Sequence, residues 1–297
     1  MEVLRPRTLA EALAMKAANP DATPIAGGTD LMVEINFGRR RPERIMDSGR
    51  LEALRRWQHA DGTVFLGAGM TYARMIRELP IFAALVQASR SVGSPQIRNR
   101  GTVGGNLGTA SPAGDVLPVL AAYDAEIVLA RDGGGERALP WHRFLVGPKQ
   151  TALAPQELVV GTRWRPARGP GSLSKVGPRN AMVIAVASLC FQMDEEARAV
   201  RVALGAVGPT VLRASDAEAF LARALANAGA CDDPRAPLGD RTVQEFGERA
   251  AAAARPIDDI RGTVVYRRHV CGVLAQRALS WALDDRRHAA GPRRVAS

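Results

Sequence analysis

The stretch PIAGGTDL, residues 24–31, places two glycines between a short apolar run and a threonine. A second stretch, IRNRGTVGGN at residues 97–106, has the same character and continues to SPAGD at residues 111–115. Glycine has no Cβ, so its backbone N–H groups approach a phosphate closely, and nearby hydroxyl and amide groups complete the shell. The two loops together predict one extended ligand with two phosphates, held from both sides.

The composition is that of a globular protein with two or three compact units. The chain has 297 residues, of which 46% are hydrophobic and 24% charged. It contains no apolar run long enough to cross a membrane, and its first residues lack the pattern of a secretion signal. We therefore expect no transmembrane segment and a cytoplasmic location.

Cysteine and histidine give no sign of a metal site in this chain. The three cysteines, Cys190, Cys231 and Cys271, form no CxxC pair, and the four histidines have no metal-ligand spacing. The net charge of +10 comes mostly from arginine and includes no basic block interleaved with aromatic residues. We expect an acidic protein partner to use this charge, and no nucleic acid.

The order of predicted elements indicates a mixed α/β front followed by an α+β tail. A capping box at Thr8 predicts a helix over residues 8–19. A strand over 23–26 and a helix over 29–36 flank the first glycine loop. Residues 93–114 show no periodicity and are interpreted as one long functional loop, followed by a helix with Pro112 in its first turn. After a linker at 166–171 we expect strands at 181–193 and 199–207 and helices at 215–228, 242–254 and 263–283.

Two common nucleotide motifs are missing. Gly67 and Gly69 follow a predicted strand but lack the third glycine of the dinucleotide fingerprint, and no lysine follows a glycine run as in a P-loop. A single Gly-Gly pair is most often only a turn. The combination of the two loops is much more specific than either loop alone.

That combination resembles the FAD-binding subunit of the xanthine dehydrogenase family of molybdenum hydroxylases, which includes the medium subunit of aerobic carbon monoxide dehydrogenase. Three later segments match the C-terminal domain of the same family: residues 174–179, 204–210 and 261–268. The resemblance covers nearly the whole chain, to about residue 283. It implies an α+β fold, with a two-lobed FAD-binding domain of the vanillyl-alcohol oxidase type before a small α+β domain.

The domain boundaries implied by the resemblance are residues 1–168 for FAD binding, with lobes at about 1–55 and 56–168, and 172–285 for the C-terminal domain. Residues 286–297 are expected to be a loose basic tail. No His or Cys lies in either glycine loop, so the FAD is expected to be non-covalent. Three isolated cysteines cannot supply the four ligands of an additional iron–sulfur cluster.

The resemblance also implies which residues contact FAD. The first loop would wrap the pyrophosphate, the second would hold its other side and the ribityl chain, and the remaining residues would lie near the ribityl or the isoalloxazine. In order these are Ile25, Ala26, Gly27, Gly28, Thr29, Asp30, Leu31, Met32, Val92, Thr102, Val103, Gly104, Gly105, Asn106, Ser111, Asp115, Val159 and Lys175. Without the family argument, Val92 and Val159 are plain core valines, Asp115 a charge at a helix start, and Lys175 a solvated surface residue.

The function implied is electron transfer. A large partner subunit would hold molybdopterin and hydroxylate the substrate. A small partner would carry [2Fe–2S] clusters and reduce this FAD, which would pass electrons to NAD, a quinone or oxygen. The family implies a dimer of heterotrimers. The alternatives are a stand-alone FAD-dependent oxidoreductase, such as a reductase of cell-wall precursors, and a scaffold that has lost its flavin. No catalytic side chain and no metal ligand is expected in this chain.

Overall fold

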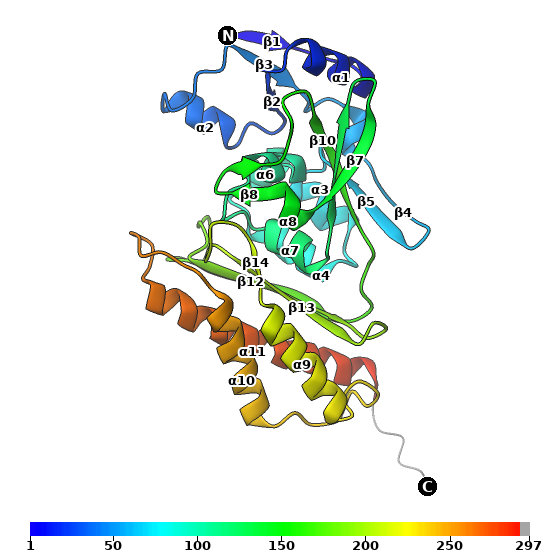
Figure 1. Ribbon diagram of the computed structural model, residues 1–297, viewed down its shortest axis with the longest axis vertical. Coiled ribbons are helices and arrows are strands. Elements are labelled where there is room, and N and C mark those ends of the chain that lie inside the picture. The colour runs from blue at the N-terminus through cyan, green and yellow to red at the C-terminus, as the bar shows by residue number, and fades with distance from the viewer. Residues whose placement is uncertain (292–297) are drawn as a thin grey trace.

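A computed structural model describes residues 1–291, and its elements form three layers along the long axis of the molecule (Figure 1). The first lobe holds a parallel sheet in the order β1-β3-β2. Its elements are β1 (Glu2–Leu4), α1 (Leu9–Ala18), β2 (Thr23–Ile25), α2 (Leu31–Asn36) and β3 (Arg44–Asp47). The predicted helix start at Thr8 is confirmed, because Thr8 Oγ1 accepts the N–H of Glu11. The return bond of the capping box is shifted by one residue, since the Glu11 carboxylate accepts the N–H of Arg7 instead of that of Thr8.

The second lobe is built on an antiparallel sheet in the order β4-β5-β10-β6-β7. Its strands are β4 (Trp57–Ala60), β5 (Thr63–Gly67), β6 (Glu126–Arg131), β7 (Gly135–Pro140) and β10 (Leu158–Trp164), and a hairpin of β8 (Leu145–Gly147) and β9 (Gln150–Thr151) lies beside it. The helices are α3 (Tyr72–Glu78), α4 (Ala83–Ser91), α5 (Pro95–Arg100), α6 (Val103–Thr109), α7 (Leu117–Ala122) and α8 (Trp141–Phe144), with a 3₁₀ turn at Glu52–Arg55.

The prediction of an irregular loop over residues 93–114 is wrong. The segment contains α5 and α6, each begun by a hydroxyl cap: Ser94 Oγ accepts the N–H of Ile97, and Thr102 Oγ1 accepts that of Gly105. Three glycines in α6 hide its helical character because glycine is a weak helix former. The next helix, α7, starts at Leu117 with Pro118 in its first turn, so the expected start at Pro112 is also wrong.

The C-terminal domain is an antiparallel sheet in the order β11-β12-β13-β14, covered on one face by three helices (Figure 1). The elements are β11 (Gly171–Val176), β12 (Ala187–Asp194), β13 (Ala199–Gly205), β14 (Leu212–Arg213), α9 (Ser215–Asn227), α10 (Asp240–Ala253) and α11 (Val264–Ala289). The three predicted helices are confirmed. The strand predicted from residue 181 begins only at Ala187, and β11 starts within the expected linker.

Part of the expected tail is ordered. Helix α11 runs to Ala289, and the side chain of Arg286 is only 4% exposed. Its guanidinium donates to the carbonyl of Ala230 at 2.7 Å and pairs with Glu195 at 2.7 Å. The interpretation of residues 286–289 as loose is therefore wrong. The remaining tail, residues 292–297, lies outside the described residues.

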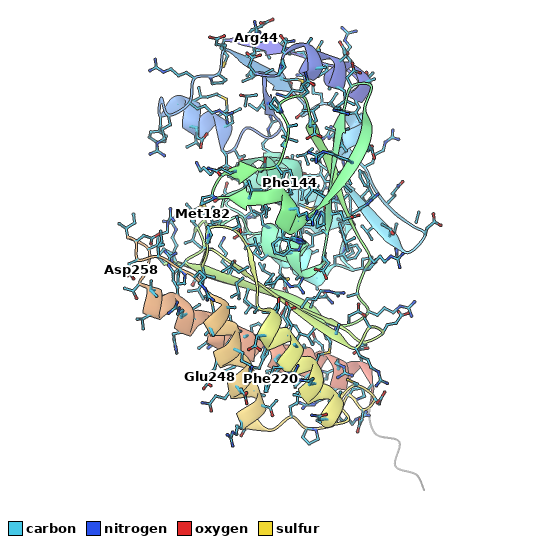
Figure 2. The ribbon with its side chains drawn as sticks, viewed as in Figure 1. Arg44, Phe144, Met182, Phe220, Glu248 and Asp258 are labelled. Carbon is cyan, nitrogen blue, oxygen red and sulfur yellow. The ribbon has the colours of Figure 1, made fainter. Side chains whose placement is uncertain are left out.

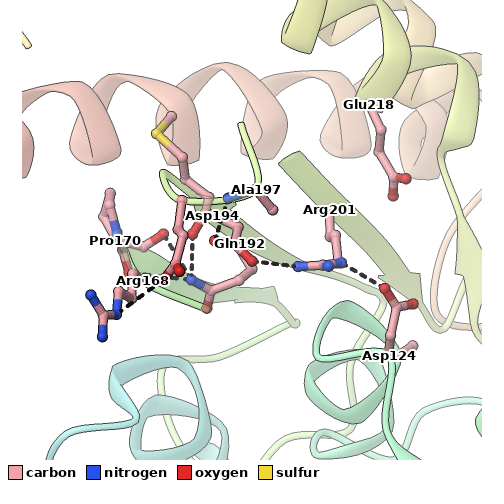
Figure 3. A network of polar contacts seen from close by, with 12 residues as sticks. Asp124, Arg168, Pro170, Gln192, Asp194, Ala197, Arg201 and Glu218 are labelled. Carbon is pink, nitrogen blue, oxygen red and sulfur yellow. Dashed lines mark hydrogen bonds and ion pairs between the residues drawn. The ribbon is translucent and has the colours of Figure 1, made fainter. Parts of the chain in front are cut away.

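The second face of the C-terminal sheet packs against the second lobe. Leu173, Cys190, Ala203 and Val211 belong to the same buried cluster as residues of α4 and α7. Figure 3 shows the polar contacts at this boundary, where Asp124 pairs with Arg201 at 2.6 Å. Arg213 also contacts Asp124 and donates to the carbonyl of Ala121 at 3.1 Å. The domains thus meet through a shared apolar core and a set of ion pairs.

Candidate cofactor-binding site

A cavity of about 330 Å³ lies between the two lobes, and both glycine loops line it. Most of the residues predicted to contact the cofactor line this cavity: Ile25, Ala26, Gly27, Gly28, Thr29, Asp30, Leu31, Thr102, Gly104, Gly105, Asn106 and Val159. Val159 comes from β10, the central strand of the second lobe, and lines the same cavity as the loops. The fold therefore brings together segments that are far apart in the sequence.

The first glycine loop leaves its backbone donors free. Within residues 1–291, the N–H groups of residues 26–30 donate no hydrogen bond. Gly28 has φ +76°, the left-handed conformation that favours glycine, and it turns the chain from β2 toward α2. Successive N–H groups in such a turn form a concave site for an anion. The loop is therefore built to receive an acceptor from outside the chain.

The first loop also lies directly on the beginning of the second loop. A Cβ built at Gly27 would overlap the carbonyl of Arg100. Asp30 extends the contact by accepting from Thr109 Oγ1 at 3.3 Å. The two lobes thus touch at the site through backbone that only glycine permits.

The second glycine loop uses its donors within the chain. The N–H of Val103 donates to Met70 and that of Gly104 to Ala68, at 3.1 and 2.8 Å. A Cβ at Gly104 would lie 2.6 Å from that of Ala68, so this glycine permits close backbone packing. A Cβ at Gly105 would meet only Thr102 Oγ1, at 3.1 Å, and is otherwise free of contacts. Gly105 therefore leaves room on the cavity side of α6.

Among the residues that the structure describes, two buried acceptors in this region have no donor. They are Asn106 Oδ1 and Asp115 Oδ1. Gly114 allows Asn106 to pack closely, because a Cβ there would lie 2.6 Å from Asn106 Nδ2. A buried acceptor without a partner costs free energy unless a ligand or water supplies the donor. These two atoms suit a ligand that carries hydroxyl groups.

Asp115 and Lys175 form a buried ion pair across the domain boundary. Lys175 Nζ lies 2.6 Å from Asp115 Oδ2, with the two side chains 9% and 7% exposed. Ser91 donates to the same carboxylate at 3.1 Å, and its carbonyl accepts from Lys175 at 3.2 Å. Burial raises the pKa of Asp115, while the lysine and the hydroxyl act in the opposite direction. Lys175 is thus a buried partner of Asp115 and not a solvated surface residue.

Six of the predicted contact residues do not line the cavity: Met32, Val92, Val103, Ser111, Asp115 and Lys175. Val103 is fully buried in the core of the second lobe, and Met32 is 37% exposed. The carbonyl of Val92 accepts from Arg98 at 3.1 Å. Ser111 Oγ accepts the N–H of Ala113 at 3.4 Å.

Several polar residues of the cavity could not be predicted from the sequence. Lys149 pairs with Glu34 at 2.6 Å, and Arg40 donates to Thr23 at 3.2 Å. Lys149 has φ +56°, in the turn between β8 and β9. No local pattern marks these residues, because each contact joins segments that are distant in the chain.

Comparison with known proteins gives the cavity its context. Residues 1–163 match the family model described as the FAD binding domain in molybdopterin dehydrogenase. The chain belongs to this family. Residues 173–282 of this flavoprotein match a second model, the CO dehydrogenase flavoprotein C-terminal domain.

Similar proteins cover nearly the full length of this flavoprotein. The carbon monoxide dehydrogenase medium chain of Hydrogenophaga pseudoflava is 30% identical, over 93% of this chain and 96% of its own. The putative xanthine dehydrogenase FAD-binding subunit of Escherichia coli K12 is 29% identical over 94% of each. A solved structure of the Hydrogenophaga enzyme lacking the Mo-pyranopterin moiety matches with TM-score 0.84 and 28% identity, covering 96% of this chain and 98% of that one.

The cofactor of the family is FAD, and the residues of the cavity suit it. Within residues 1–291, five backbone N–H groups without acceptors match a diphosphate, and the buried Asn106 Oδ1, which has no donor, matches a ribityl hydroxyl group. Gly105 lines the cavity, and a Cβ at this position would occupy space next to the ligand. None of the helices within residues 1–291 is both long and apolar enough to cross a membrane.

Proposed function

We propose that this chain binds FAD non-covalently between its two glycine loops and transfers electrons within a molybdenum-containing hydroxylase. A small partner subunit with [2Fe–2S] clusters reduces the flavin, and an external acceptor oxidises it. The substrate is hydroxylated on a large molybdopterin subunit. The observation that carries the proposal is the row of free N–H groups in the first loop, facing the second loop across one cavity in a member of this family.

Each part of the site has a distinct role. The N–H groups of residues 26–30 bind the diphosphate, with a hydroxyl from Thr29, while Thr102 and Asn106 contact the same ligand from the second loop. Asp115 accepts from a ribityl hydroxyl through its free oxygen. Val92 and Val159 pack near the ring system. FAD itself supplies the redox chemistry, and the chain supplies position and electrostatics.

Lys175 provides a fixed positive charge near the flavin. A cation held at the domain boundary favours the reduced, anionic form of a nearby flavin on electrostatic grounds. The ion pair with Asp115 holds the ammonium in place in the absence of ligand. In this proposal the flavin ring lies at the boundary between the domains proposed over residues 1–168 and 172–285.

The assembly proposed is a dimer of heterotrimers in the cytoplasm. The relatives are described as medium chains or FAD-binding subunits of larger dehydrogenases. A chain that only binds a flavin and transfers its electrons needs no general acid or base. In agreement with this, no histidine paired with a carboxylate lies among the residues that line the cavity.

The first experiment is a visible spectrum of the tagged protein purified from its natural host, followed by identification of the released cofactor. FAD, iron–sulfur absorbance and two further subunits together support the whole proposal. FAD on a lone, stable chain supports flavin binding and rejects the heterotrimer, in favour of a stand-alone oxidoreductase. A colourless chain that takes up no added FAD rejects the assignment of the cavity.

A further inference from the structure

Tyr72 combines deep burial with a hydroxyl group that lacks a hydrogen-bond partner. The residue begins α3, is only 5% exposed and lines the cavity between the lobes. Within residues 1–291 its hydroxyl forms no hydrogen bond, and the oxygen is not fully enclosed by protein atoms. Because so little of the residue is exposed and it lines the cavity, the accessible part of the hydroxyl belongs to the cavity.

The backbone of Tyr72 is fixed to the second glycine loop. The N–H of Tyr72 donates to the carbonyl of Gly101 at 3.1 Å. The preceding residue, Thr71, pairs with Thr102 as an antiparallel bridge. The start of α3 and the second loop therefore form a short two-stranded ladder, which sets the position of the tyrosine.

The aromatic ring of Tyr72 lies where the two loops meet. A Cβ built at Gly101 would lie 2.7 Å from Tyr72 Cε2, so the ring rests directly on the Gly101 backbone. Gly27 of the first loop lies against the carbonyl of Arg100, the residue just before Gly101. The ring also belongs to the same buried cluster as Phe144, which is labelled in the second lobe in Figure 2. The ring is thus held from both the loops and the core.

The surroundings of the hydroxyl keep it protonated. Burial raises the pKa of Tyr72, and the negative charges of Asp115 and Asp30 act in the same direction. Asp115 pairs with Lys175, and Asp30 accepts from Thr109. The Tyr72 hydroxyl is therefore a neutral donor that neither carboxylate uses.

An anionic oxygen of a ligand suits this donor. A hydroxyl at such depth costs free energy unless an acceptor is supplied, and hydrogen bonds to charged acceptors are the strong ones. The free N–H groups of residues 26–30 favour a diphosphate beside the junction of the loops, whereas Val103 and Gly104 donate to their own core. Tyr72 thus offers, from the second lobe, a donor that the backbone of the second loop does not.

We propose that Tyr72 is a further ligand-binding residue, whose hydroxyl donates a hydrogen bond to a diphosphate oxygen of FAD. The inference rests on the proposed function, because FAD supplies the acceptor. It adds a side-chain donor from α3 to the backbone donors of the first loop, so that the diphosphate is held from both lobes.

The test removes one hydroxyl from each of two buried tyrosines. Tyr72→Phe keeps the ring on Gly101, and the control Tyr123→Phe changes a tyrosine of the same buried cluster that lies outside the cavity lining. Titration measures FAD binding to the apo chain, and chemical denaturation measures its stability. We expect Tyr72→Phe to weaken FAD binding roughly tenfold or more, with the stability of the apo chain unchanged. Tyr123→Phe should bind FAD as the wild type does.

Phosphorus NMR of bound FAD locates the contact. FAD is added at a saturating concentration to the wild type and to both variants. We expect one of the diphosphate signals to shift in Tyr72→Phe and none to shift in Tyr123→Phe. If FAD binding weakens in Tyr72→Phe while the diphosphate signals keep their positions, the hydroxyl contacts another part of the ligand and the proposal is rejected.

The outcomes separate the two proposals. If the wild type binds FAD and Tyr72→Phe binds it equally tightly, the role of Tyr72 is wrong and the proposed function stands. If the wild type takes up no FAD, the proposed function itself fails. Equal weakening of FAD binding in the two variants, or a matching loss of apo stability in Tyr72→Phe, would assign the effect to packing and reject a direct contact.

Discussion

The two glycine loops look alike in the sequence and use their backbones in opposite ways. The first leaves the N–H groups of residues 26–30 free for a ligand. The second donates from Val103 and Gly104 to its own core, and its glycines serve packing at Gly104 and open space at Gly105. Similar composition therefore provides a binding surface in one loop and a structural support in the other.

The largest effect is expected at Lys175, which ties the segment after the second loop to the C-terminal domain. Lys175→Met leaves the buried Asp115 carboxylate without its cation, and we expect a loss of about 3 kcal/mol in the free energy of unfolding at neutral pH. Chemical denaturation of the apo chain measures it. The double variant Lys175→Met/Asp115→Asn removes both charges and should regain most of the loss.

The pH dependence of Lys175→Met follows from the raised pKa of Asp115. When the folded state has the higher pKa, it binds the proton more readily than the unfolded state. The contribution of Asp115 to stability is then greatest at a pH below its pKa in the unfolded chain, and it is lost as the pH rises through its pKa in the folded protein. The loss in the free energy of unfolding caused by Lys175→Met should therefore become smaller as the pH is lowered toward the pKa of Asp115 in the unfolded chain. A defect that is constant with pH would place its cause in packing instead.

Gly105→Val tests the open side of the second loop. The side chain projects into the cavity, so we expect FAD affinity to fall about 100-fold, which corresponds to about 2.8 kcal/mol, with the fold retained. Titration with FAD and far-UV circular dichroism measure the two properties. Full flavin occupancy in this variant would show that the ligand lies elsewhere.

Gly104→Val is the matched variant one residue earlier. Its side chain meets Ala68 inside the protein, and we expect the apo chain to lose about 2 kcal/mol of stability. Flavin affinity should change only as far as the fold is disturbed. If Gly104→Val and Gly105→Val lowered the stability of the apo chain equally, Gly104 would not differ from Gly105 in being needed for packing.

The smallest effect concerns the helix caps. Thr102 and Thr71 both accept a backbone N–H at a helix start, but only Thr102 lines the cavity. Each threonine-to-alanine change should cost about 1 kcal/mol of stability. Only Thr102→Ala should also weaken FAD binding. A parallel loss of flavin in Thr71→Ala would show that the affinity follows stability alone.

The glycine loops and the long elements could be predicted because their signals are local. Thr8 with Glu11 marks a helix start, and the apolar spacing over residues 215–228 marks α9. The difference between the loops could not be predicted, since the acceptors for the second loop are the carbonyls of Ala68 and Met70, far back in the chain. The contact of Lys149 with Glu34 spans a still greater distance in sequence.

Short and edge elements were missed for a different reason. The edge strand β7 is polar along half its length, and α6 contains three glycines, so neither shows the periodicity of its class. Buried charges were missed as well. Arg286 and Lys175 resemble surface residues in the sequence, and only the tertiary contacts with Glu195 and Asp115 explain their burial.

The sheet of the C-terminal domain has a consequence for how such proteins diversify. On β12 the side chain of Cys190 belongs to the core shared with the FAD-binding domain, while its neighbours Leu189 and Phe191 belong to the core under the helices. Recombination between the genes of two relatives at residues 166–171 would transfer the core under the helices of the C-terminal domain complete. The core shared with the FAD-binding domain would then combine side chains from two different proteins. Successful hybrids should carry compensating changes on α4 and α7, so these two helices and the sheet are expected to evolve together.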